Sequence, residues 1–269
     1  MLAVSRSDYY RWKTAPAPMA DHMDLRDGIQ RIALEMPAYG YRRMTAELRR
    51  RGVVANHKLV LRLMGEDNLL CLRQKSFWRT TDSRHGWPVY PNLVPALTIN
   101  GLDQLWVADI TYIRLAQEFV YLAVILDAYS RRCIGWGLDW ILDAGLAVEA
   151  LRMALATRTV QPGLVHHSDR GVQYASGEYT KLLQQNGIRI SMSRVGNPYD
   201  NAKAEAFMKT LKYEEVYRCE YEDLPDARTR IGEFLTLVYN EKRLHSALGY
   251  RPPAEFERAL VASSLGVVR

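Results

Sequence analysis

The order of strand-like and helix-like segments after residue 104 limits the folds open to this chain more than any other feature. Three segments rich in Val, Ile, Tyr and Trp follow one another with only short polar turns between them, at 104–114, 119–127 and 131–140. Such spacing predicts an antiparallel meander. Helical and strand-like segments then alternate, at 143–158, 164–168, 177–186, 188–192 and 201–217. The order predicts an α/β fold with a mixed five-stranded sheet and flanking helices.

The first third of the chain is instead helical and basic. Helices are expected at 23–35, 42–51 and 56–64, and a short turn containing Gly52 separates the last two, as in a helix-turn-helix region that binds DNA. Residues 1–95 carry sixteen Lys and Arg against nine Asp and Glu, whereas the remainder is nearly balanced. The candidate phosphate contacts are Arg42, Arg43, Lys58 and Arg62. A solvated, Arg-rich helix face explains the same charge distribution equally well.

Composition narrows the class of protein. The 269 residues are 48% hydrophobic and 25% charged, as in ordinary soluble domains. Apolar runs stay shorter than the roughly eighteen residues of a membrane span, and the amino terminus lacks a secretory signal. Cys71, Cys133 and Cys219 form neither a disulfide framework nor a metal motif, which favours a reducing cytosol.

Three carboxylates form the candidate site. They occur in the motifs Trp106-Val-Ala-Asp109-Ile-Thr-Tyr, His166-His-Ser-Asp169-Arg-Gly and Asn201-Ala-Lys-Ala-Glu205. Asp109 lies in the middle of a mostly apolar strand, Asp169 at the end of a strand, and Glu205 on a helix. Gathered in space, three carboxylates offer oxygen ligands to Mg²⁺, and two such ions can hold a phosphodiester during in-line displacement. Asp169 or Glu205 alone is better explained as a turn cap or a solvated side chain, but all three in this order favour a metal site.

Neighbouring polar residues allow weaker hypotheses. Lys209 and Lys212 share a helix face with Glu205 and are candidate phosphate contacts, although surface lysines are more often only solvated. His166 and His167 are adjacent on a strand and therefore point to opposite faces. Because the chain has no Gly-x-Ser-x-Gly motif, a serine hydrolase is rejected. One of the two histidines could contact a phosphate or support Asp169, but packed structural histidines are the default expectation.

Longer motifs connect these residues to a known family. They are Trp106-Val-Ala-Asp109-Ile-Thr-Tyr-Ile, Tyr121-Leu-Ala-Val-Ile-Leu-Asp-Ala-Tyr-Ser-Arg-Arg, His167-Ser-Asp169-Arg-Gly-Val-Gln-Tyr, the segment from Ser191 to Glu205, and Arg243-Leu-His-Ser-Ala-Leu-Gly-Tyr. Together they resemble the OrfB-type DDE transposases of bacterial insertion sequences, in the family called IS-three and the retroviral-integrase superfamily. The resemblance covers nearly the whole chain and implies a ribonuclease-H-like catalytic core.

The resemblance also implies a reaction. Asp109, Asp169 and Glu205 would ligate two Mg²⁺ ions, with Mn²⁺ as a substitute. The enzyme would nick the ends of an insertion sequence, and the freed 3′-hydroxyl would attack another DNA strand. Two alternatives are a non-catalytic DNA-binding or regulatory protein, and a nuclease of the same fold that never joins strands.

The residue patterns and the family resemblance together predict the domain organisation and the partners. We expect a helical DNA-binding region at 1–73, a linker at 74–100, a catalytic core at 101–222 and a helical extension at 223–269. The linker either contacts DNA or simply connects the domains. The expected partners are double-stranded DNA, as terminal inverted repeats and target, and further copies of the chain in a synaptic complex. The upstream helix-turn-helix and leucine-zipper product of such elements is another candidate, since no sustained heptads occur here. The expected location is the bacterial cytoplasm, on DNA.

Overall fold

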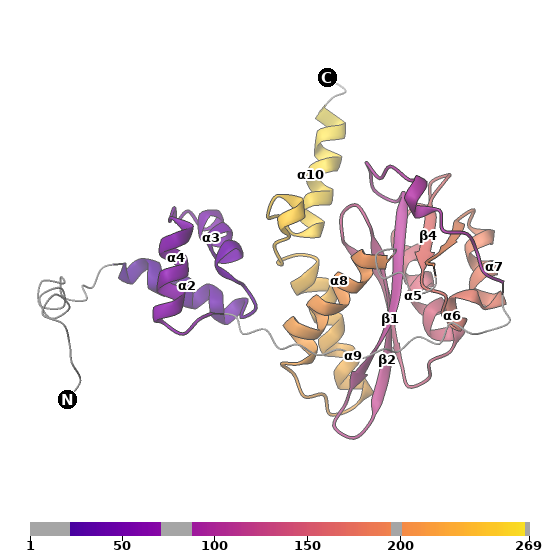
Figure 1. Cartoon of the computed structure of the whole chain (residues 1–269), viewed down its shortest axis with the longest axis horizontal. Coiled ribbons are helices and arrows are strands. Elements are labelled where there is room, and N and C mark those ends of the chain that lie inside the picture. The colour runs from indigo at the N-terminus through magenta and orange to yellow at the C-terminus, as the bar shows by residue number, and fades with distance from the viewer. Residues whose placement is uncertain (1–21, 71–87, 195–200, 267–269) are drawn as a thin grey trace, which may run out of the picture. The chain divides into compact units, whose positions relative to one another are not determined.

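The computed structural model describes residues 22–70, 88–194 and 201–266 and separates into two compact units, 1–72 and 73–269 (Figure 1). Among the described helices, none has the length and apolarity that a membrane span requires.

The first unit is a small bundle of α2 (Met23–Glu35), α3 (Tyr41–Arg50) and α4 (His57–Glu66). The three helices occur where the sequence predicts them, because apolar side chains recur at helical spacing along each one. Their shared core consists of Ile29, Ile32, Met44, Leu48, Val60, Leu63 and Met64. Asn56 begins α4 as an N-cap, with its side-chain oxygen accepting a 2.8 Å hydrogen bond from the backbone N–H of Lys58.

The second unit is built on a five-stranded sheet in the order β3-β2-β1-β4-β5. The predicted meander is present: β1 (Leu105–Arg114), β2 (Phe119–Asp127) and β3 (Cys133–Asp139) pair antiparallel. The short strands β4 (Val165–Ser168) and β5 (Arg189–Met192) continue the sheet in parallel with β1. The expected mixed α/β sheet is therefore confirmed.

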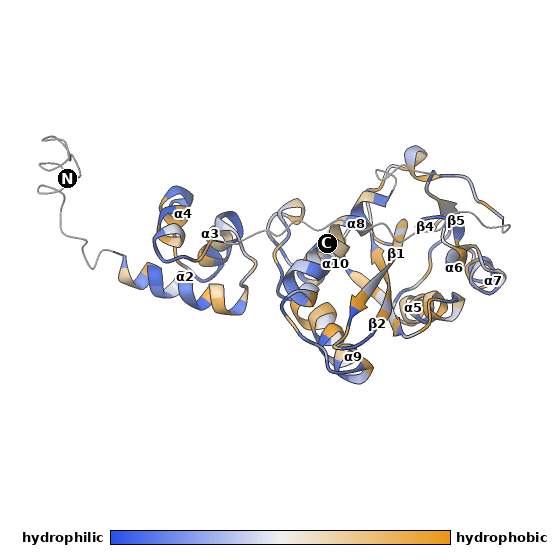
Figure 2. Cartoon of the chain, turned by 60° about the horizontal axis from the view of Figure 1, so that its bottom comes forward, coloured by the Kyte–Doolittle hydropathy of each residue, from blue (hydrophilic) through white to orange (hydrophobic). Residues whose placement is uncertain are grey.

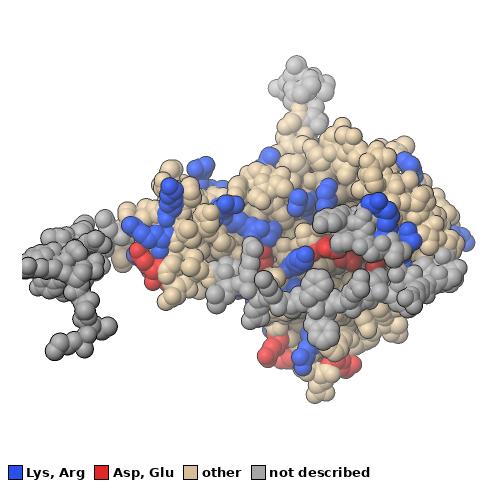
Figure 3. Space-filling model, in the orientation of Figure 1, with Lys and Arg blue, Asp and Glu red and all other residues tan. Residues whose placement is uncertain are grey.

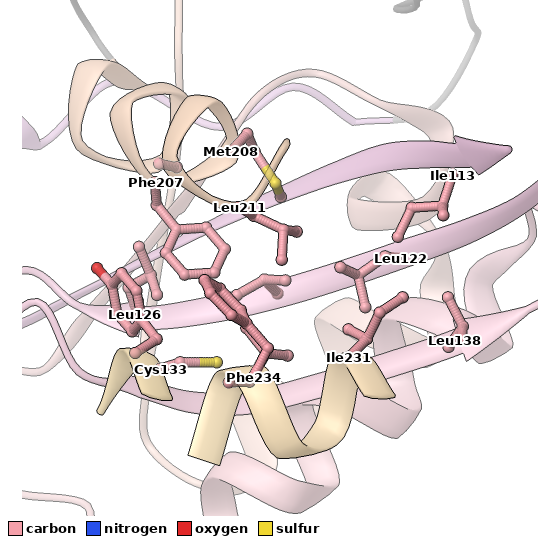
Figure 4. Packing of buried hydrophobic residues seen from close by; sticks show 14 of the residues in the cluster. Ile113, Leu122, Leu126, Cys133, Leu138, Phe207, Met208, Leu211, Ile231 and Phe234 are labelled. Atoms are coloured by element: carbon pink, nitrogen blue, oxygen red, sulfur yellow. The ribbon is translucent and has the colours of Figure 1, made fainter. Parts of the chain in front are cut away.

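Helices cover both faces of this sheet, and their apolar sides turn inward (Figure 2). On one face lie α5 (Ala144–Thr157), α6 (Val172–Ala175) and α7 (Gly177–Gln185). On the other lie α8 (Ala202–Leu211), α9 (Leu224–Glu233) and the π-helical segment η4 (Phe234–Tyr239). The α8 side chains Phe207 and Leu211 meet Ile231 and Phe234 over the strands (Figure 4). On the α5 face, a Cβ at Gly135 would collide with the carbonyl oxygen of Ala150, so only glycine permits this contact.

Several elements depart from the predicted ones. The helix expected over 201–217 divides into α8 and a π-helical turn, η3 (Lys212–Val216), and the four-residue α6 was not predicted. Within 88–100, the 3₁₀ turn η1 (Val94–Ala96) packs on the core through its flanking apolar residues. The backbone N–H of Leu93 donates to Ser191 Oγ at 2.9 Å. The described end of the expected linker is thus attached to the sheet unit.

The carboxyl-terminal segment is joined to the sheet by side-chain hydrogen bonds. It contains η5 (Ser246–Leu248) and α10 (Pro253–Gly266). Asn240 bonds both main-chain groups of Cys133 on the edge strand β3: its Nδ2 donates at 2.9 Å and its Oδ1 accepts at 3.0 Å. Arg243 forms a bidentate ion pair with Glu214 in η3, with N–O distances of 2.7 and 2.8 Å. These contacts connect the end of the chain with β3 and with the continuation of α8.

Candidate functional site

Asp109 lies in β1, and Asp169 directly follows the neighbouring strand β4. In the parallel pairing of β1 with β4, Leu105 is opposite Val165 and Val107 is opposite His167. Asp109 and Asp169 each follow the last of these paired residues, Val107 and His167, by two positions, and adjacent strands lie about 4.8 Å apart. By strand alternation, Asp109 shares the sheet face of Leu105 and Val107, which is the face that α8 covers.

Asn201 places Glu205 beside this pair. Its side-chain Nδ2 donates a 3.0 Å hydrogen bond to the carbonyl oxygen of Ala108, the residue before Asp109. Asn201 is the residue immediately before α8, and Glu205 follows one helical turn later. The start of α8 is therefore fixed to the strand at the position of Asp109. The sequence had suggested only that Asn201 shares a helix face with Glu205; the bond joins residues too distant in the chain for a local pattern to reveal.

The charges of the three carboxylates act on one another. The pKa of Asp109 is raised to about 8, first because burial penalises the charged form and then because Asp169 and, less strongly, Glu205 repel it. The backbone N–H of Ile110 and the Lys212 ammonium oppose this shift. In the described parts of the chain, no three His, Cys, Asp or Glu side chains are close enough to form a metal cage. The charges of Asp109, Asp169 and Glu205 thus act on one another, although the three side chains are not close enough together to form a metal cage.

This donor set suits a hard divalent cation. Three carboxylates supply the oxygen ligands that Mg²⁺ prefers, and a dication would offset the repulsion that raises the pKa of Asp109. Two of the carboxylates are already oriented by the backbone. Asp109 Oδ1 accepts from the N–H of Ile110, and Asp169 Oδ1 from the N–H of Gly171, both at 2.9 Å.

Of the two candidate lysines, Lys212 is the one near the carboxylates. Its half-buried ammonium lies 4.6 Å from the centre of the Tyr112 ring, burial lowers its pKa, and Asp109 acts in the opposite direction. Lys209 is exposed on α8. One face of the second unit shows basic side chains around a group of acidic ones (Figure 3).

Both histidines are buried and packed, as expected. The His167 ring nitrogens lie 2.8 Å from Ser191 Oγ and 3.0 Å from Ser193 Oγ, so the ring joins β4 to β5 and the residue that follows it. His166 Nε2 is 2.8 Å from the hydroxyl of Tyr179 in α7. The adjacent rings contact different partners because they point to opposite faces of the strand.

In the first unit, the candidate DNA contacts lie on α3 and α4. Arg42, Lys58 and Arg62 are exposed, whereas Arg43 is half-buried with its guanidinium 5.8 Å from the centre of the Tyr39 ring. Arg62 also lies 3.6 Å from Glu66 on the same helix. The structure thus presents basic side chains on two adjacent helices.

Relatives over nearly the whole chain establish the family. The chain is 36% identical to the insertion element IS600 31 kDa protein of Shigella sonnei, over 95% of this chain and 96% of that protein. It is 33% identical to the transposase InsF for insertion sequence IS3A of Escherichia coli, over 97% and 93% of the two chains. The chain belongs to the IS3 family of insertion-sequence transposases. The IS904 transposase of Lactococcus lactis is 35% identical over 82% of this transposase and 87% of its own length.

Family models match separate parts of the transposase. Two models described as integrase core domain match residues 100–198 and 186–253, and a model described as HTH-like domain matches residues 21–77. The resemblance and the fold class predicted from the sequence are both confirmed. A solved catalytic core of bovine immunodeficiency virus (BIV) integrase is 19% identical, covering 61% of the transposase and 99% of that chain with a TM-score of 0.45.

Proposed function

We propose that this transposase is a Mg²⁺-dependent polynucleotidyl transferase. It would nick DNA at the ends of its insertion sequence and join the freed 3′-hydroxyl to another strand. Asp109, Asp169 and Glu205 would hold two Mg²⁺ ions, which Mn²⁺ can replace. The observation that supports the proposal most directly is the 3.0 Å hydrogen bond from Asn201 to the carbonyl oxygen of Ala108, since it joins the start of the helix of Glu205 to the strand of Asp109.

The residues of the site have separate tasks in this proposal. The carboxylates bind the cations, and Asn201 holds the helix of Glu205 against the strand of Asp109. When bound, the cations supply Lewis acidity and lower the pKa of the attacking hydroxyl group. Lys212, and Lys209 from the helix surface, contact DNA phosphates.

Binding of the DNA falls mainly to the first unit. Arg42, Arg43, Lys58 and Arg62 on α3 and α4 would contact the phosphates of the terminal inverted repeats, and target DNA would enter the catalytic unit. Holding two ends together requires a homo-oligomer, and the upstream product of the element is a further partner. The reaction would take place on DNA in the bacterial cytoplasm. The assignment of DNA binding to the first unit is supported by the HTH-like match over 21–77 and by the exposed basic side chains there.

Labelled element-end DNA incubated with the protein and Mg²⁺ tests this proposal. Asp109→Asn and Glu205→Gln are expected to abolish cleavage and to leave DNA binding largely intact, because each removes a metal ligand and leaves every basic side chain in place. Glu118→Gln, at an exposed carboxylate beside the β1–β2 turn, is the control and is expected to cleave normally. If either site variant cleaved DNA at the rate of the unmodified protein, the assignment of the metal site would be wrong.

The same assay separates the alternatives by their products. Binding without cleavage by the unmodified protein would indicate a regulatory DNA-binding protein. Cleavage without any joined product would indicate a nuclease. A joined product that depends on Mg²⁺ supports the transferase.

A further inference from the structure

A buried tyrosine hydroxyl near the carboxylates has no hydrogen-bond partner. Tyr174 lies in α6, five residues after Asp169, and is 3% exposed. Among the described residues only five buried side-chain polar atoms lack a partner, and the Tyr174 hydroxyl is one of them. Burying a hydroxyl without a partner is costly, so such an atom calls for an explanation.

The ring of Tyr174 is close to the carboxylate of Asp169. A Cβ placed on Gly171 would lie 3.0 Å from Asp169 Oδ1 and 3.7 Å from Cδ2 of Tyr174. Any side chain at residue 171 would therefore occupy the space between the carboxylate and the ring. Burial and then the neighbouring Tyr179 raise the pKa of Tyr174 well above its ordinary value, and the charges of Asp169 and Asp109 add to this shift, so the hydroxyl is within electrostatic reach of the pair.

A second buried tyrosine provides the comparison. Tyr179 packs edge-on against Tyr174, with 5.4 Å between ring centroids, and both rings also contact His166. The Tyr179 hydroxyl, however, has a partner, His166 Nε2 at 2.8 Å, and burial alone raises its pKa. The two tyrosines lie in the same hydrophobic core, but only the Tyr179 hydroxyl has a hydrogen-bond partner.

Packing alone does not account for the Tyr174 hydroxyl. A phenylalanine would keep the aromatic contacts and avoid burying an unpartnered hydroxyl. The hydroxyl gains a role if the carboxylates become fully charged and fixed around a cation, because an O–H group is then a strong donor to a carboxylate oxygen.

We propose that Tyr174 is a positioning residue, whose hydroxyl donates a hydrogen bond that orients the Asp169 carboxylate when a divalent cation is bound. This inference rests on the metal site of the proposed function. Partners that hold metal-ligating side chains in place typically change metal affinity by about tenfold or more.

Paired Tyr→Phe variants test the inference in the full-length protein. In EDTA, Tyr174→Phe is expected to melt at the same temperature as the unmodified protein or higher, since it removes an unpartnered hydroxyl. The Mg²⁺ concentration that gives half of the cation-induced rise in melting temperature is expected to increase about tenfold. The same increase is expected for half-maximal cleavage of element-end DNA. Tyr179→Phe is the control: it should melt lower in EDTA and keep the normal Mg²⁺ dependence.

The outcomes distinguish this inference from the function on which it rests. If the unmodified protein responds to Mg²⁺ and Tyr174→Phe responds at the same concentration, the role of Tyr174 is wrong and the metal site stands. If the unmodified protein shows no Mg²⁺-induced rise in melting temperature and no Mg²⁺-dependent cleavage, the metal site and the role of Tyr174 both fail. A higher Mg²⁺ requirement in both Tyr174→Phe and Tyr179→Phe would show that any disturbance of the aromatic cluster weakens the Mg²⁺ response. That result also overturns a specific role for the Tyr174 hydroxyl.

Discussion

At the scale of single residues, Asp109 opposes the stability of the fold that contains it. Its carboxyl group is partly removed from water in the sheet and meets the charges of Asp169 and Glu205, and its pKa rises to about 8. A carboxylate that is easier to ionise in the unfolded chain than in the folded one weakens folding once the pH exceeds its ordinary pKa of about 4.

Stability should therefore depend on pH through Asp109. Between about pH 4 and pH 8 the folded chain keeps a proton that the unfolded chain has released, so the free energy of unfolding falls as the pH rises. Without divalent cations, Asp109→Asn is expected to be more stable than the unmodified protein at pH 8, by roughly 1–3 kcal/mol after allowance for solvent screening. The difference should vanish near pH 4. Urea unfolding in EDTA across this range measures it, and a constant difference at every pH would contradict the assignment.

At the scale of elements, α8 is held at its start, its middle and its end. Asn201 bonds the backbone of β1 before the helix begins. Phe207 packs edge-on against Tyr239, with 4.8 Å between ring centroids, and Arg243 pairs with Glu214 in the π-helical turn that continues the helix. The carboxyl-terminal segment thus helps to fix the helix that carries Glu205.

The pair of Arg243 and Glu214 gives a test at this scale. The two side chains are only 4% and 11% exposed, so Arg243→Met alone would leave a carboxylate buried without its cation. We expect a loss of about 3–5 kcal/mol in the free energy of unfolding. Changing Glu214→Met as well should recover most of this loss, because an apolar pair of similar volume often replaces a buried ion pair at little cost. Urea unfolding of both variants measures the effect. A double variant as unstable as the single one would show that other interactions of Arg243 dominate.

The elements also show what the sequence could predict and what it could not. Strands β1 to β3 and helices α2 to α5 repeat apolar residues over enough positions to reveal their period, so they were predicted nearly to their ends, whereas α9 and α10 were predicted only as a helical extension at 223–269. The helix α6 has four residues, too few to set a period, and one wider turn after Leu211 leaves the helical pattern almost unchanged. The bonds from Asn201 to Ala108 and from Asn240 to Cys133 span 93 and 107 residues, beyond any local pattern. The positions of Asp109, Asp169 and Glu205 were predicted, but their role as metal ligands stays a prediction.

At the scale of the whole molecule, the candidate DNA contacts and the carboxylate site belong to different units. The exposed Arg42, Lys58 and Arg62 lie on α3 and α4 of the first unit. Asp109, Asp169 and Glu205 all lie in the second unit. Affinity for DNA and chemistry on DNA should accordingly respond to different substitutions.

Replacing Arg42, Arg43, Lys58 and Arg62 together by Gln tests this separation. We expect weaker binding to element-end DNA and a smaller dependence of the affinity on salt, by about 0.9 in logarithmic slope for each phosphate that the protein no longer neutralises. The Mg²⁺-induced rise in melting temperature should not change. Fluorescence anisotropy at several salt concentrations measures the slope, with Arg152→Gln on α5 as the control at an exposed arginine of the other unit. An unchanged slope would assign DNA binding to other residues.

The two hydrogen bonds from Asn240 to Cys133 have a consequence for synthesis on the ribosome. A β-strand at the edge of a sheet can pair with any extended chain nearby unless its main-chain groups are occupied. All five strands are translated before Asn240, so a sheet that forms without this residue has an open position at Cys133 on the edge strand β3. The carboxamide then occupies both main-chain groups of Cys133, at the start of this edge strand. A message cut short before this codon would yield a protein with every strand present and a sheet prone to self-association.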